Sequence, residues 1–255
     1  MRNCDIFADP APVSGKRMIW PNTALSDDAV HVWRVTLDAN AARLGRLEHH
    51  LSSDERARAA RFRFERDRRN FILVRGLLRE IVSRYLDTSP DRPRFRYGAQ
   101  GKPHLVQQGN SDLRFNLAHT SSTALFAVTR GREVGVDIER ITPDVPVEEL
   151  AEMVFSTPER QILGDLDGRS RREVFFRFWA RKEAYIKADG RGVSLPLERI
   201  DVSGQDRVAI LDESTGTWRT PERWTLRTIE AGRDHAAALA AEGRDWHPVC
   251  RQWPG

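Results

Sequence analysis

The chain has 255 residues, of which 40% are hydrophobic and 31% are charged, and its formal net charge is +4 at pH 7. This composition can bury the core of one large domain or of two fused halves, and it contains no apolar run near the roughly 18 residues of a membrane span and no secretory signal at Met1. We therefore expect a cytoplasmic protein, and the positive charge favours acidic partners such as nucleic acid, an anionic membrane surface, a polyphosphate ligand or an acidic protein.

The first part of the chain is predicted to be an irregular extension that then enters a strand. Residues 1–29 contain several Pro, Gly, Asp and Ser and show no sustained periodicity, whereas residues 30–35 alternate as a strand does. The two cysteines, Cys4 and Cys250, lie near opposite ends and suggest neither a disulfide framework nor a zinc site. We expect both thiols to be free.

Two helices in series are predicted next, and they carry a dense group of arginines. Ser52 and Glu55 form a capping-box pattern that opens the first helix, and apolar residues recur at helical spacing from Phe71 to Tyr85 in the second. For each arginine taken alone, a solvated face is as good an interpretation as ligand binding. The group consists of Arg56, Arg58, Arg61, Arg63, Arg66, Arg68, Arg69, Arg75 and Arg79.

A connector and three short strands follow the helices. Residues 90–103 are rich in turn formers and end in Gly101-Lys102-Pro103, where Pro103 fixes the backbone and Lys102 can reach outward. Residues 115–119, 124–128 and 134–139 then alternate as the strands of a meander, with His119 beside the first turn. A lone histidine at a strand end is usually structural.

The third of these strands carries two carboxylates on one face. Gly135, Asp137 and Glu139 alternate with three apolar residues, so they face the side opposite to the apolar one. Two carboxylates at this spacing repel each other unless solvent, a proton or a cation lies between them. Alone, the pattern is more typical of a solvated strand face.

A helix predicted over residues 175–190 supplies a third carboxylate. If this helix packs over the carboxylate face of the strand, Glu183 joins the two strand carboxylates, and three carboxylates with waters describe a Mg²⁺ site that leaves room for substrate phosphates. The alternative is an ordinary helix with a Glu-to-Lys pair worth about 0.2–0.5 kcal/mol. The stripe at successive i, i+4 positions is Trp179, Glu183 and Lys187.

The order of strand, helices and strands occurs twice along the chain. We predict an N-terminal half over residues 30–131, a C-terminal half over residues 132–245 and a tail over residues 246–255. In the second half, Thr157 is predicted to cap a helix with Pro158 in its first turn. The fold class is α/β in the broad sense (α+β), with a small, mostly antiparallel sheet and packed helices in each half.

These motifs stand in the order found in a known family. Gly135-Val136-Asp137-Ile138-Glu139, the run from Phe178 to Lys187, and Gly190-x-Gly192-x-Ser194-Leu195-Pro196-Leu197 closely resemble the 4′-phosphopantetheinyl transferases of the Sfp type. Gly101-Lys102-Pro103 and Phe115-Asn116-Leu117-Ala118-His119-Thr120 resemble two further motifs of that family. The resemblance runs from about Leu51 to the strands after Pro196, and it implies two halves related by a pseudo-twofold axis and a monomeric enzyme.

The resemblance implies that the chain transfers the 4′-phosphopantetheine arm of coenzyme A to a serine of an apo acyl carrier or peptidyl carrier protein, releasing 3′,5′-ADP. Fatty-acid, polyketide and nonribosomal peptide carriers all remain open, and neither nucleic acid nor a membrane is implied as a partner. Asp137, Glu139 and Glu183 would hold Mg²⁺, or Mn²⁺ in its place. Asp137, Glu183 and Lys187 would be catalytic, and either Glu183 or a water on the metal would take the serine proton.

Coenzyme A itself would be bound mostly by basic residues of both halves. The family commonly has Ser-His-Ser where this chain has Ala118-His119-Thr120, so position 118 offers only a backbone amide. The residues that the resemblance assigns to coenzyme A are Arg58, Arg61, Arg69, Lys102, Pro103, His119, Thr120, Lys182 and Lys187.

Two other interpretations use the same residues. A different Mg²⁺-dependent phosphotransferase or phosphodiesterase would hydrolyse nucleotides without any carrier protein. A nucleic-acid-binding module would grip phosphates with its arginine-rich helices and depend steeply on salt, but it would leave Asp137 and Glu139 unexplained.

Overall fold

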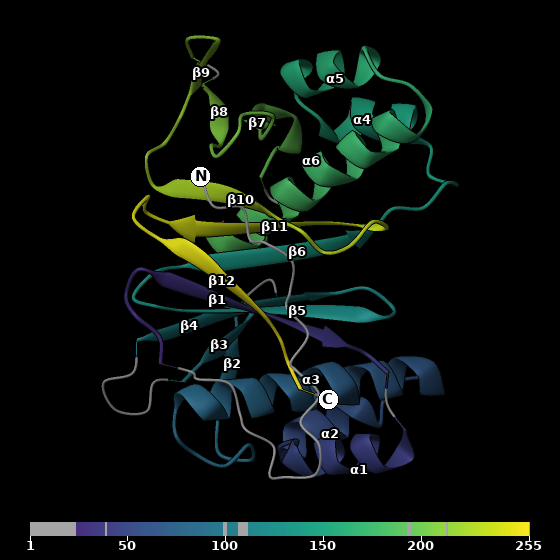
Figure 1. The fold of residues 1–255 in the computed structure, drawn as a ribbon, viewed down its shortest axis with the longest axis vertical. Helices are drawn as coiled ribbons and strands as arrows, with labels where there is room; N and C mark the ends of the chain where they lie inside the picture. The colour runs from purple at the N-terminus through teal and green to yellow at the C-terminus, as the bar shows by residue number, and fades with distance from the viewer. Residues whose placement is uncertain are drawn as a thin grey trace.

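The computed structural model describes residues 24–38, 40–98, 101–106, 112–192, 195–212 and 214–254. Within these ranges, two small sheets lie between two groups of helices, so that helices, sheet, sheet and helices follow one another as layers (Figure 1). The predicted fold class, mixed α/β with small and mostly antiparallel sheets, is confirmed. No helix in the described part is both long and apolar enough to cross a bilayer.

The first sheet has the strand order β12-β1-β5-β4 and is covered by helices from the first third of the chain. Along β1, Val30 and Val32 face the other sheet, whereas Trp33 and Val35 face the helices, because successive side chains of a strand point to opposite sides. The elements of this part are β1 (Ala29–Thr36), α1 (Ala41–His50), α2 (Ser53–Ala59), α3 (Glu65–Tyr85), the paired β2 (Phe95–Tyr97) and β3 (Pro103–Leu105), β4 (Leu113–His119) and β5 (Thr123–Arg130).

The second sheet has the order β10-β11-β6 and lies under α6. The predicted meander is wrong in its third strand, because β6 pairs with β11 and not with β5. Gly131, at a φ of +62°, turns the chain from one sheet into the other. The elements here are β6 (Val134–Arg140), α4 (Val147–Val154), α5 (Thr157–Gly164), α6 (Gly168–Asp189), the 3₁₀ turn η2 (Leu197–Arg199), β10 (Trp224–Ile229), β11 (His235–Glu242), and a separate small sheet of β7 (Ile200–Asp201), β8 (Ala209–Asp212) and β9 (Thr217–Arg219).

The helix ends follow local sequence signals, with one correction. The backbone amide of Ser52 donates to the Glu55 carboxylate at 3.0 Å, as the capping-box pattern predicts. Gly190 ends α6 at a φ of +82°, a left-handed conformation that glycine adopts without a Cβ penalty. At α5, however, Ser156 and not Thr157 is the N-cap, since its hydroxyl accepts from the Glu159 amide.

The predicted tail over residues 246–255 is wrong. Residues 247–252 form β12 (His247–Gln252), which pairs in parallel with β1 and completes the edge of the first sheet. Trp246 and Trp253 flank this strand and are buried, the first between the sheets and the second against the helices of the first sheet. Cys250 is disulfide-bonded, so the prediction of free thiols is wrong for this residue. Most of the predicted extension over residues 1–29 lies outside the described part, and β1 begins at Ala29.

Candidate functional site

The site is built on the contact between helix α6 and strand β6. A Cβ atom placed on Gly135 would lie 2.1 Å from the carbonyl oxygen of Ala184 and 2.4 Å from the backbone nitrogen of Ala188. Only glycine permits this approach, because any larger residue would overlap the helix backbone. The helix therefore lies directly on the strand face that carries Asp137 and Glu139. This is the packing that the sequence analysis required for Glu183 to join the two strand carboxylates.

The two strand carboxylates both bond to side chains of α6. Asp137 is 3% exposed, and its Oδ1 accepts a hydrogen bond from the Lys187 ammonium at 2.6 Å. Its Oδ2 is buried and has no hydrogen-bond partner among the described residues. The Glu139 carboxylate accepts from the indole N–H of Trp179 at 3.1 Å. The ring of Trp179 thus positions Glu139.

Burial raises the proton affinity of all three carboxyl groups. Burial raises the pKa of Glu139 to about 7, and the charges of Asp137 and Glu183 add to the effect. Burial likewise raises the pKa of Asp137 and that of Glu183, while the nearby ammonium of Lys187 lowers both. Repulsion of this kind is relieved by a proton or a cation.

The donor set suits a hard divalent cation, although the side chains are not gathered around a single point. In the ranges that the structure covers, no three Asp, Glu, His or Cys side chains are grouped as ligands of one ion. Lys187 instead supplies the positive charge at Asp137 Oδ1. Carboxylate oxygens are the preferred ligands of Mg²⁺, and the unpaired Oδ2 of Asp137 is a free acceptor. The chemistry of these residues therefore fits the predicted ion.

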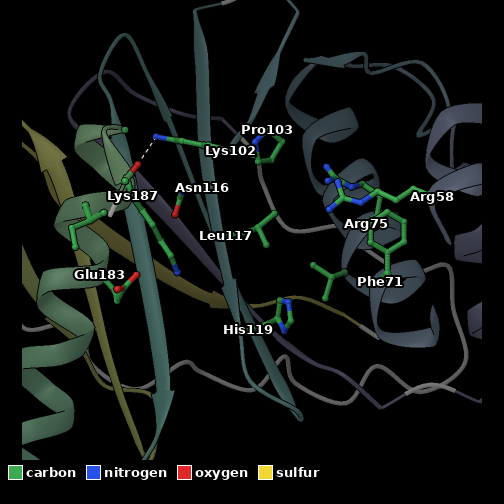
Figure 2. Close-up of a pocket in the computed structure, with 15 residues that line it drawn as sticks. Arg58, Phe71, Arg75, Lys102, Pro103, Asn116, Leu117, His119, Glu183 and Lys187 are labelled. Carbon is green, nitrogen blue, oxygen red and sulfur yellow. Dashed lines mark hydrogen bonds between the residues drawn. The ribbon is translucent and has the colours of Figure 1, made fainter. Parts of the chain in front are cut away.

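A cavity of about 420 Å³ runs from this carboxylate region to the arginines of α2 and α3 (Figure 2). It joins residues of β4 to residues of both helix groups, which lie far apart in the sequence. Of the predicted site residues, Arg58, Lys102, Pro103, His119, Glu183 and Lys187 line it.

Other residues assigned to coenzyme A do not line this cavity. Arg61 and Arg69 are exposed on the surface. The Thr120 hydroxyl instead accepts backbone N–H bonds within the turn between β4 and β5. Ala118 is buried between the two sheets. A serine at this position would therefore place its hydroxyl in the core and not in the cavity. Ser194 of the last motif lies outside the described residues.

The assignment of Lys182 to coenzyme A is wrong. Its side chain is fully buried, and its ammonium pairs with the Glu159 carboxylate at 2.8 Å. The same ammonium donates to the carbonyl oxygens of Leu197 and Ile200. One residue along a helix is a rotation of about 100°, so a side chain next to Glu183 points away from the carboxylate face. Lys182 therefore links α6 to α5 and to the segment after the last motif.

Lys102 lines the cavity but directs its ammonium into the protein. The Lys102 Nζ donates to the backbone carbonyl oxygen of Lys187 at 2.6 Å and lies 3.4 Å from the Glu133 carboxylate (Figure 2). This bond ties the last turn of α6 to the segment that leads into β3. Lys102 thereby holds the backbone that carries Lys187.

Two further residues at the cavity were missed by the sequence interpretation. The amide oxygen of Asn116 accepts a bond from the Val136 amide at 3.0 Å and joins β4 to β6 across the sheets. Arg75 lies on the buried side of α3 and reaches the cavity. The sequence did contain a signal for Arg75, since an arginine four residues after Phe71 falls on the apolar face and needs a partner there.

Comparisons with known proteins agree with these observations. Residues 133–240 match the family model described as the 4′-phosphopantetheinyl transferase superfamily, and residues 38–130 match the one described as 4′-phosphopantetheinyl transferase, N-terminal. The 4′-phosphopantetheinyl transferase HetI of Nostoc sp. is 38% identical over 229 residues, which are 89% of this chain and 94% of the relative.

More distant similarity extends to other members. The 4′-phosphopantetheinyl transferase Sfp of Bacillus subtilis is 26% identical over 200 residues, covering 77% of this chain and 84% of the relative. A crystal structure of a holo-(acyl-carrier-protein) synthase from Bacillus anthracis in complex with CoA (3′,5′-ADP) is 22% identical, with a TM-score of 0.34, over 44% of this chain and 96% of that one. The chain belongs to the 4′-phosphopantetheinyl transferase superfamily, as an enzyme of the two-domain, Sfp-like type.

Proposed function

We propose that this protein transfers the 4′-phosphopantetheine arm of coenzyme A to a serine of an apo acyl carrier or peptidyl carrier protein and releases 3′,5′-ADP. The observation that carries the proposal is the single cavity that joins Arg58 and His119 to Glu183 and Lys187. A ligand with phosphates at both ends of such a cavity meets cations at each end. Coenzyme A has this form, since its nucleotide carries a 3′-phosphate and its pyrophosphate leads to the arm.

The residues of α6 and β6 act at the pyrophosphate. The serine oxygen attacks the β-phosphorus, and the bond from that phosphorus to the bridging oxygen breaks, so that 3′,5′-ADP leaves with the electron pair. Lys187 has three donor protons, of which one bonds Asp137, and the others can bond the charged phosphate oxygens. Glu183, whose pKa is raised by burial, accepts the serine proton.

Asp137, Glu139 and Glu183 would hold Mg²⁺, which neutralises charge on the pyrophosphate and on the leaving group when it is bound. His119, at the end of β4, contributes a polar group to the lining of the cavity. We further propose that the enzyme acts as a monomer in the cytoplasm.

Intact-mass spectrometry of a carrier protein tests the proposed function. A purified apo carrier is incubated with the enzyme, coenzyme A and Mg²⁺, and the expected result is a mass gain of one phosphopantetheine group. Asp137→Ala and added EDTA should each abolish the gain, whereas Glu149→Ala, which removes an exposed carboxylate from α4, should leave it unchanged. No gain with fatty-acid, polyketide and peptidyl carriers, or full activity of Asp137→Ala, would overturn the proposal.

A further inference from the structure

Strand β6, which carries Asp137 and Glu139, forms one edge of the second sheet. On one side it pairs with β11, and on the other side it lies close to β4, which is an edge of the first sheet. In the part of the chain that the structure describes, no backbone ladder joins β4 to β6. The backbone N–H and C=O groups on the outer edge of β6 therefore need other partners, because a buried peptide group without a hydrogen bond is unfavourable.

Asn116 supplies such a partner from β4. Its amide oxygen accepts a hydrogen bond from the backbone N–H of Val136 at 3.0 Å, and both groups are buried. The neighbours of Asn116 on β4, Phe115 and Leu117, pack with the helices of the first sheet, so the alternation of the strand turns Asn116 toward β6. A side-chain oxygen thus occupies the place that a carbonyl oxygen of a neighbouring strand has in a continuous sheet.

Lys102 supplies a second partner along the same edge. Its ammonium lies 3.4 Å from the carbonyl oxygen of Val134, two residues before Val136, so both backbone groups point away from β11. The same ammonium bonds the carbonyl oxygen of Lys187 on α6 at 2.6 Å. Asn116 and Lys102 both line the cavity (Figure 2), so side chains of its wall complete the outer edge of β6.

Asp137 follows Val136 directly, and the backbone there is held on three sides. Helix α6 covers one face of the strand at Gly135, β11 pairs with one edge, and Asn116 bonds the other edge. If the Asn116 side chain is removed, the buried N–H of Val136 loses its partner, and the strand gains by moving this edge toward water. A shift of the backbone at Val136 moves the next side chain with it, which is the carboxylate of Asp137.

We propose that Asn116 is a positioning residue for the transfer reaction, because its amide oxygen fixes the β6 backbone at Val136 and so holds the Asp137 carboxylate against α6. Asn116 acts through Asp137 and does not need to touch the reacting atoms. This inference rests on the proposed function and deepens it, since it adds a residue of the first sheet to the carboxylate region of the second. It also accounts for an amide side chain that is only 6% exposed on β4.

Amide hydrogen exchange followed by NMR tests the bond directly and needs no substrate. Asn116→Ala removes the acceptor, so the Val136 amide should exchange at least about tenfold faster than in the wild type. Asn116→Asp keeps an acceptor oxygen at the same place and should keep the Val136 amide protected. Loss of protection in the first variant alone assigns the effect to the acceptor oxygen.

Steady-state transfer kinetics test the consequence for the reaction. Asn116→Ala should lower kcat about tenfold and leave the KM for coenzyme A within about twofold, because Asp137 moves while the arginines of α2 and α3 keep their places. A residue that contacted coenzyme A directly would instead raise KM when it is removed.

Thr225→Val is the matched control, because Thr225 makes a similar bond at the opposite edge of the same sheet. Thr225 lies on β10, is 5% exposed, and donates its hydroxyl to the carbonyl oxygen of Gly243. That oxygen also accepts from the Trp246 indole, so it keeps a partner in the variant. The variant should change neither kcat nor the exchange of the Val136 amide.

The outcomes separate the inference from the proposed function. Wild-type exchange of the Val136 amide in Asn116→Ala, an unchanged kcat, or a raised KM at unchanged kcat overturns the inference alone. If Asn116→Ala does not fold, the wild type and Asn116→Asp decide, because an unprotected Val136 amide in either means that the bond does not hold the strand. A wild type that transfers the arm to no carrier overturns the proposed function and the inference with it.

Discussion

At the scale of single residues, helical phase decides what a charged side chain does. Lys182 and Lys187 are both lysines of α6, and the sequence assigned both to coenzyme A. Lys187 lies on the face over β6 and bonds Asp137, whereas Lys182 points to the opposite side and is fully enclosed. Glu159, the partner of Lys182, also accepts backbone bonds from Ser156 and Val202, so the buried pair is completely bonded. Such a pair fixes the position of α6 and contributes nothing to ligand binding directly.

Lys182→Met is therefore expected to change stability and leave ligand affinity unaltered. Removing one partner leaves the Glu159 carboxylate buried and unpaired, which should lower the free energy of unfolding by about 3–5 kcal/mol. Urea unfolding measures that loss, and calorimetry measures coenzyme A affinity under conditions where the variant is folded. Lys187→Met is the comparison and should reduce transfer. If Lys182→Met binds coenzyme A more weakly while its stability is unchanged, this prediction is wrong and Lys182 contacts the ligand, as the sequence suggested.

At the scale of elements, the site depends on how closely α6 lies on β6. The alternation of β6 places its apolar residues against the first sheet and Gly135, Asp137 and Glu139 under the helix. The alanines Ala236, Ala238 and Ala240 of β11 also face the helix core. Small side chains on both strands let a long helix approach the sheet closely and bring its Glu183 and Lys187 within reach of the strand carboxylates.

Gly135→Ala should push the helix off the strand. The added Cβ would meet backbone atoms of Ala184 and Ala188, which cannot move independently of α6. We expect a loss of about 1–3 kcal/mol in the free energy of unfolding from overpacking, together with a fall in transfer activity. Thermal unfolding and the carrier-mass assay measure the two effects.

Gly45→Ala in α1 is the matched control, because a Cβ there meets nothing within 4 Å. It should raise stability by about 0.4–1 kcal/mol, since alanine has less conformational freedom than glycine in the unfolded chain. Equal behaviour of the two variants would mean that α6 adjusts to the extra methyl group without cost.

At the scale of the whole molecule, the end of the chain returns to its beginning. β12 lies beside β1, and the Trp253 amide donates to the Arg34 carbonyl oxygen at 2.8 Å. The rings of Trp33 and Trp253 meet edge to face at 5.1 Å in the core under the first sheet. The strand β12 thus completes the sheet of the N-terminal half, although along the chain it comes directly after the C-terminal half.

Trp253→Ala is expected to destabilise the whole protein by about 3–5 kcal/mol, the usual cost of a large cavity in a core. Denaturant unfolding followed by circular dichroism measures this loss. Trp218→Ala, which removes a tryptophan from an exposed site on β9, should change stability by no more than about 0.5 kcal/mol. If the unfolding midpoint of Trp253→Ala is unchanged, residues 246–255 do not stabilise the fold and behave as the tail predicted from the sequence.

The sequence by itself determined the local features: the alternation of β6, the stripe of Trp179, Glu183 and Lys187, and the end of α6 at Gly190. These follow from periods of two and 3.6 residues and from the freedom of glycine, which need no knowledge of distant contacts. The order of the motifs also identified the family, and with it the fold class.

Only the tertiary structure decided the features that depend on which elements pack together. β6 joins β11 instead of β5, β12 completes the first sheet, Lys182 is enclosed beside α5, and the buried Arg75 lines the cavity. Each of these features depends on contacts between residues far apart in the chain. The periodicity of a sequence tells on which face of a helix or strand a residue lies, but not which element packs against that face. Packing supplies that opposite surface, so the partners of these residues are properties of the fold and not of the local sequence.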